Sequence, residues 1–136
     1  MKRAILAVLG GLVTWILVVS VLNRGLRLAL EGYSAAEPRM TFTLGMMAAR
    51  LTIGAVTSVI AGAMSGWIAP LSSRVAWILG VLLLVVFIPD HVRLWSSFPV
   101  WYHMTFLVTL VPLVVFGSWL RRARTSDEPV PAAPLP

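Results

Sequence analysis

The sequence contains no cysteine and has few charged residues. Of its 136 residues, 12% are Asp, Glu, Lys or Arg and 59% are hydrophobic. Without cysteine the chain forms no disulfides, and it offers no thiolate for a metal site or for nucleophilic catalysis. So small a number of polar residues does not cover the surface of a soluble protein of this size. The composition therefore predicts an integral membrane protein whose surroundings are the lipid bilayer.

The short motifs that carry common chemistries are also missing. The sequence has no GxSxG, no glycine-rich phosphate loop and no dinucleotide-binding fingerprint. Two histidines, His91 and His103, are too few for a closed zinc site. We therefore expect no catalytic residues, no metal site and no enzymatic activity.

Four apolar runs of helical length divide the chain. They predict one transmembrane domain, 1–124, with spans over 4–24, 40–69, 74–95 and 99–120, followed by a proline-rich disordered tail, 125–136. The third span requires a helix that continues through Pro89, which a membrane helix tolerates with a kink. We expect a loop over 31–40, with Pro38 in the first turn of the second helix. The predicted fold is all-α, an antiparallel four-helix transmembrane bundle with both termini on the same side.

The net charge of +6 is explained by basic residues that flank the apolar runs. In a four-span arrangement, Lys and Arg at positions 2, 3, 74, 121, 122 and 124 share one side of the membrane, against positions 24, 27, 39 and 93 on the other. The side with more basic residues is normally cytoplasmic. We therefore expect an inner (plasma) membrane protein with cytoplasmic termini, and we assign the basic residues to topology and lipid headgroups, with no nucleic acid as partner.

The second run carries small residues on two faces of its helix. At about 100° per residue, one face holds a set of small residues that includes a GxxxG motif. The residues of this face are Ala48, Ala55, Gly62 and Gly66. This is more packing surface than one four-helix bundle requires. The leading functional hypothesis is therefore a non-catalytic accessory or structural subunit that forms homo-oligomers or packs against a larger membrane complex.

Arg50 lies inside the second run, where a charge costs at least about 2.5 to 3.5 kcal/mol on insertion scales. It therefore needs a partner or a water-filled pocket. Further polar residues are expected in the same extracytoplasmic half, namely Glu37, Asp90, His91, Arg93 and His103. The second hypothesis is a transporter or binder of a small anionic or lipidic ligand that enters from this side, with Arg50 as its anchor. On a structural interpretation, Arg50 instead extends toward the interface or pairs with Glu37 or Asp90.

His91 and His103 lie near the ends of neighbouring predicted helices, which suggests a third hypothesis. Either histidine would supply an axial nitrogen to haem or chlorophyll in an accessory subunit. The alternative is a hydrogen-bonded histidine at the membrane interface, which requires no cofactor. The aromatic residues nearby, Trp95, Trp101 and Tyr102, are interpreted as an interfacial aromatic belt.

Overall fold

The computed structural model describes residues 2–70 and 72–126, and this part of the chain contains helices and no strand. The elements are α1 (Lys2–Ala29), the short α2 (Tyr33–Ala36), the 3-10 helix η1 (Glu37–Arg39), α3 (Leu44–Ile68), α4 (Ser73–Arg93) and α5 (Val100–Ser126). Within the described residues, α1, α3, α4 and α5 are each long and apolar enough to cross a membrane. The prediction of an all-helical chain with four long apolar helices is therefore confirmed.

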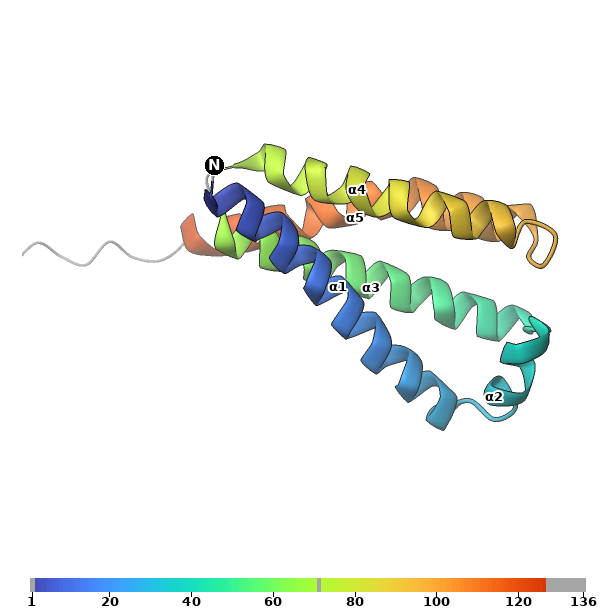
Figure 1. The fold of residues 1–136 in the computed structure, drawn as a ribbon. Coiled ribbons are helices and arrows are strands. Elements are labelled where there is room, and N and C mark those ends of the chain that lie inside the picture. Colours follow the sequence, from blue (N-terminus) through green and yellow to red (C-terminus); the bar gives the residue numbers. More distant parts are fainter. Residues whose placement is uncertain (1, 71, 127–136) are drawn as a thin grey trace, which may run out of the picture.

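The four long helices run alternately in opposite directions (Figure 1). α3 packs mainly against α1 and α5, and α4 packs mainly against α5. The start of α1 and the end of α5 lie at one end of the bundle, whereas α2, η1 and the turn between α4 and α5 lie at the other (Figure 1). Toward this second end α1 diverges from α4 (Figure 1).

Glycines bring the backbones of α3 and α5 into direct contact. A Cβ atom at Gly62 would overlap the carbonyl oxygen of Val114, and one at Gly117 would overlap the carbonyl oxygen of Val59. Gly66 lies against α5 in the same way. The other two small residues of this predicted face lie differently, since Ala48 is exposed and Ala55 is half-buried. Gly62 and Gly66 are therefore covered within the chain and are not available to a second protein.

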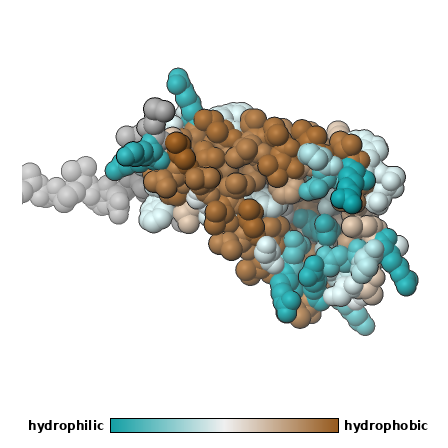
Figure 2. Space-filling model, in the orientation of Figure 1, coloured by the Kyte–Doolittle hydropathy of each residue, from teal (hydrophilic) through white to brown (hydrophobic). Residues whose placement is uncertain are grey.

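The main core lies in the middle of the bundle. Its buried members come from all four long helices and are Trp15, Ala61, Leu79, Leu83, Leu110 and Val114. The indole Nε1 of Trp15 donates a hydrogen bond to Ser58 Oγ (3.2 Å), and Ser58 Oγ donates to the carbonyl of Gly54 (2.7 Å). The Trp15 and Ser58 side chains are thus paired inside an otherwise apolar core. Large apolar side chains cover much of the outer surface (Figure 2).

The segment between the first two long helices differs from the prediction. Residues 31–40 are not a loop, because they contain α2 and η1. Pro38 belongs to η1 and not to the first turn of α3. Met40 adopts a left-handed conformation (φ 53°), which ends η1, and α3 begins only at Leu44. Thr43 caps α3 because its Oγ1 accepts a hydrogen bond from the backbone N–H of Met46 (3.3 Å).

The ends of the other helices also differ from the predicted spans. α1 reaches Ala29, five residues beyond the predicted end at position 24. α4 passes through Pro89 and ends at Arg93. α5 contains Pro112 and extends to Ser126, two residues into the predicted tail. The remainder of that tail, 127–136, lies outside the described residues.

Candidate functional site

Hydrophilic residues gather at the end of the bundle that carries α2, next to a hollow in the surface (Figure 2). A pocket of about 310 Å³ lies here between α1, α3, α4 and α5. Its polar lining residues are Asn23, Arg50, Asp90, His91, Tyr102 and His103. Trp15, Phe87 and Phe106 lie one or two helical turns deeper along their helices and form an apolar floor. The pocket is therefore amphipathic, with polar groups at the level of Arg50 and aromatic rings beneath them.

Arg50 is held by neutral groups. Its Nη1 donates a hydrogen bond to the hydroxyl of Tyr33 (2.7 Å), and its Nε donates to the hydroxyl of Tyr102 (3.3 Å). The guanidinium carbon lies 4.9 Å from the centroid of the Phe42 ring, a cation–π contact. No carboxylate of residues 2–70 or 72–126 lies within ion-pair distance of Arg50. The phenols satisfy two N–H groups, but they leave the positive charge without a counter-charge.

The short elements between α1 and α3 place these aromatic groups over Arg50. Gly32 adopts a left-handed conformation (φ 77°), which glycine tolerates without strain, and the chain turns there into α2. Tyr33 follows and is fully buried, and its ring lies 5.4 Å from that of Phe42. An ion pair between Arg27 Nε and Glu37 Oε2 (2.8 Å) joins α1 to η1. The turn at Gly32 and the packing of Tyr33 against Phe42 place the Tyr33 hydroxyl at the Arg50 guanidinium.

The two histidines form a direct pair between α4 and α5. His91 Nδ1 and His103 Nδ1 are 2.7 Å apart, within hydrogen-bonding distance. His103 is completely buried, and Trp95 stacks on its ring with a centroid distance of 4.8 Å. Its other ring nitrogen, Nε2, is buried without a hydrogen-bond partner. His91 is half-buried and lines the pocket.

This pairing bears on the metal and cofactor hypotheses. The described residues contain no group of three or more His, Cys, Asp or Glu side chains that could hold a metal ion. For haem or chlorophyll, the hydrogen bond occupies the Nδ1 atoms of both histidines. The Nε2 atom of His103 is buried, which leaves the Nε2 atom of His91 as the candidate axial nitrogen of the pair.

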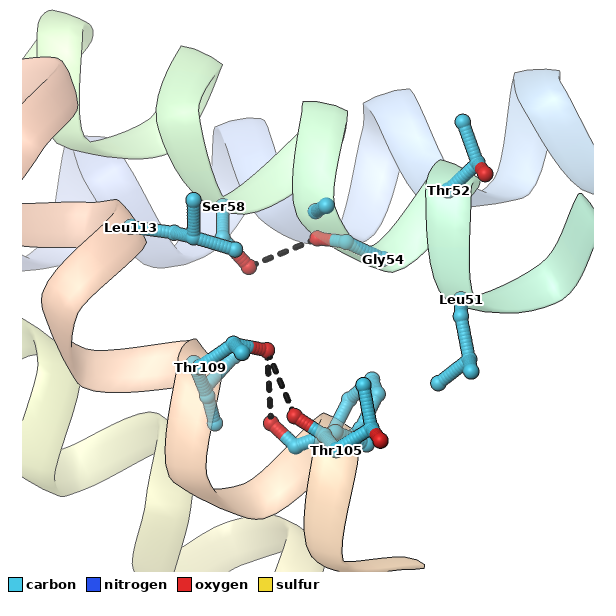
Figure 3. Close-up of a pocket in the computed structure, with 10 residues that line it drawn as sticks. Leu51, Thr52, Gly54, Ser58, Thr105, Thr109 and Leu113 are labelled. Carbon is cyan, nitrogen blue, oxygen red and sulfur yellow. Dashed lines mark hydrogen bonds between the residues drawn. The ribbon is translucent and has the colours of Figure 1, made fainter. Parts of the chain in front are cut away.

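A second pocket, of about 240 Å³, lies between α3 and α5 (Figure 3). The hydroxyl of Ser58 donates to the carbonyl of Gly54 (2.7 Å) and that of Thr109 to the carbonyl of Thr105 (2.6 Å), each within its own helix (Figure 3). Its lining includes no ionisable side chain. Because this second pocket has no ionisable lining residue and its Ser58 and Thr109 hydroxyls are already paired, the pocket around Arg50 is the stronger candidate site.

The structure brings together four of the six predicted site residues. Arg50, Asp90, His91 and His103 line the pocket. Glu37 does not, because it pairs with Arg27 on the outer side of η1. Arg93 is exposed at the end of α4 and is also outside the pocket lining. The expected pairing of Arg50 with Glu37 or Asp90 is not observed.

Sequence reasoning missed both phenols that hold Arg50. Tyr102 was expected in the interfacial belt, but it is only 7% exposed and accepts a hydrogen bond from Arg50, so that assignment is wrong. Tyr33 lies in the segment that was expected to be a loop. The available signal was the need of an intramembrane arginine for polar partners, which phenol hydroxyls meet as well as carboxylates do.

No family model, no curated protein and no solved structure matches this chain. The functional interpretation therefore depends on the geometry of the pocket.

Proposed function

We propose that this protein is a four-span membrane protein that binds a small anionic amphiphile in the pocket around Arg50. The observation that supports this most directly is the environment of the Arg50 guanidinium, which has phenol partners but no carboxylate partner among the described residues. A buried or partly buried charge is normally paired, because its transfer out of water costs free energy. A negatively charged headgroup would supply the missing counter-charge.

The geometry leaves donors for such a headgroup. A guanidinium has five N–H groups. The two phenols use one on Nε and one on Nη1, so three remain without a partner among the described residues, two of them on Nη2. Hydrogen bonds between a guanidinium and an oxyanion are about twice as strong as neutral ones. The aromatic floor of Trp15, Phe87 and Phe106 would hold the apolar part of the ligand.

We further propose that the four long helices cross the inner (plasma) membrane and that both termini lie in the cytoplasm. Basic residues support this orientation, because positions 2, 3, 74, 121, 122 and 124 lie at the end of the bundle opposite α2, against positions 24, 27, 39 and 93 at the α2 end. The pocket would then open toward the extracytoplasmic side. Because the chain lacks cysteine, single cysteines introduced at Ser34 and Ser73 report the two ends independently. A membrane-impermeant maleimide applied to intact cells should label Ser34→Cys and not Ser73→Cys, and the reverse pattern would contradict the orientation.

Binding is tested with a medium-chain carboxylate, decanoate labelled at its carboxyl carbon, in nanodiscs of phosphatidylcholine. The wild type should give a bound carboxylate resonance in NMR spectra. Arg50→Gln keeps a hydrogen-bonding side chain but removes the charge, and it should weaken binding at least about tenfold, as expected for loss of a charge-assisted hydrogen bond. Neutral decanol should bind more weakly than decanoate to the wild type.

Two matched variants provide the control. Arg27→Gln and Arg93→Gln each remove one arginine charge outside the pocket lining. Both should bind decanoate as the wild type does. If Arg50→Gln retains wild-type affinity, or if all three variants lose affinity equally, the proposed function is wrong.

A further inference from the structure

The proposed function gives the His91–His103 pair a specific role. We infer that His103 fixes the tautomer of His91, so that His91 presents an Nε2–H donor to the pocket and, together with Arg50, selects a monoanionic carboxylate headgroup. This inference rests on the proposed function and names its ligand class.

The tautomer follows from the burial of the two rings. The Nδ1 atoms are 2.7 Å apart, so one of them carries a proton and donates a hydrogen bond, and the other accepts this hydrogen bond. A neutral histidine has a single N–H group. If the shared proton belonged to His91, the proton of His103 would be on Nε2, which is buried without a partner. Buried N–H groups without a partner are rare because they cost free energy.

In the opposite arrangement, each N–H group either has a hydrogen-bond partner or is accessible from the pocket. His103 then donates from Nδ1 to His91 Nδ1, and the proton of His91 is on Nε2. His91 is half-buried and lines the pocket, and its Nε2 has no partner among the described residues. Water or a ligand can therefore accept from this nitrogen. His103 acts as a positioning residue because it determines which nitrogen of His91 carries the proton.

Arg50 and His91 both lie close to the same tyrosine. Tyr102 accepts the hydrogen bond from Arg50 Nε (3.3 Å), and the centroid of its ring is 6.3 Å from that of His91. Both donors line one pocket of about 310 Å³. A headgroup between them must accept two hydrogen bonds and donate none, which a carboxylate does and an ammonium group does not.

Asp90 favours a single negative charge on this headgroup. Its side chain lines the same pocket and is exposed. Arg50 offsets the first negative charge of a headgroup, whereas a second negative charge has no further Lys or Arg in the pocket lining and is repelled by Asp90. We therefore expect the pocket to prefer decanoate over decyl phosphate, whose headgroup carries up to two negative charges.

The tautomer is tested first in the wild-type protein. Nitrogen NMR of histidine-labelled protein in nanodiscs should show His103 protonated at Nδ1 and His91 protonated at Nε2, and the resonance of the His91 Nε2–H group should shift when decanoate binds. A proton on Nε2 of His103 would overturn the inference. This measurement requires no substitution, so it does not depend on the stability of a variant.

Two substitutions of His103 then separate its hydrogen bond from its volume. The amide nitrogen of Asn can replace Nδ1 as the donor to His91, so His103→Asn should bind decanoate within about twofold of the wild type. His103→Leu has no donor and should bind roughly fivefold more weakly, the factor that corresponds to about one neutral hydrogen bond. Equal affinities of His103→Leu and the wild type would overturn the role of His103.

The outcomes distinguish this inference from the proposed function. If Arg50→Gln loses binding but His103→Leu does not, the anionic site stands and the histidine donor is wrong. If decyl phosphate binds more tightly than decanoate, the carboxylate assignment is wrong. If Arg50→Gln binds as the wild type does, the proposed function and this inference both fail.

Discussion

The contact between α3 and α5 leads to a prediction whose size can be worked from the structure. In Gly62→Ala, the added Cβ atom would overlap the carbonyl oxygen of Val114, and it would lie 2.8 Å from the carbonyl carbon and 3.0 Å from the Cα atom of that residue. All three atoms belong to the backbone, so no side-chain rotation relieves the overlap. The two helices must therefore move apart along this contact, where Gly117 is packed as closely and a Cβ atom at Gly66 would lie 3.0 Å from the carbonyl oxygen of Ser118.

Two opposing terms determine the expected change in the free energy of unfolding. Overpacking of a well-packed site typically costs about 1 to 3 kcal/mol, and a contact between two backbones lies at the upper end of this range. Replacement of Gly by Ala inside a helix contributes up to about 1 kcal/mol in the opposite direction. The net effect for Gly62→Ala is a destabilisation of about 2 kcal/mol.

Gly25→Ala is the matched control. Gly25 lies in α1, and no atom approaches its Cβ position within 4 Å. Only the helix-propensity term applies there, so this variant should be as stable as the wild type or more stable. Unfolding in mixed micelles with increasing dodecyl sulfate, followed by circular dichroism, measures both. If Gly62→Ala were as stable as Gly25→Ala, the direct contact between α3 and α5 would be refuted.

Three further substitutions test the surroundings of the site by the same unfolding assay. Tyr33→Phe removes the acceptor of the 2.7 Å bond from Arg50 and should destabilise the protein by about 1.5 to 3 kcal/mol, whereas wild-type stability would contradict that bond. Trp15→Phe removes the hydrogen bond from the indole to the Ser58 hydroxyl and should lower the free energy of unfolding by about 1 kcal/mol. Unchanged stability would show that this bond contributes nothing. Arg27→Gln breaks an exposed ion pair with Glu37 and should leave stability nearly unchanged, so a large loss would show that this pair holds η1 in place.

The pocket also explains why the candidate site was only partly predictable. Arg50 was recognisable because a charge within an apolar run is costly wherever the helix packs. Its partners were not, because Tyr33 is 17 residues before it and Tyr102 is 52 residues after it in the sequence. No periodicity within one helix relates residues at such separations.

The sequence by itself determined the class of fold. Length and continuity of the apolar runs are local properties, and they are sufficient to predict four long apolar helices. The continuation of α4 through Pro89 was also predictable, because the apolar run before this proline is too short to cross a membrane. The glycines of the second run likewise indicated a closely packed helix face, although not which helix would cover it.

The tertiary structure decided which groups meet. The register of α4 against α5 places His91 at His103, and the fold of α2 and η1 places Tyr33 above Arg50. Hydrophobic burial specifies which face of a helix turns inward, but it constrains weakly how far one helix slides along another. Hydrogen bonds depend on that sliding distance to within a few tenths of an ångström, and so the site was set by packing between helices.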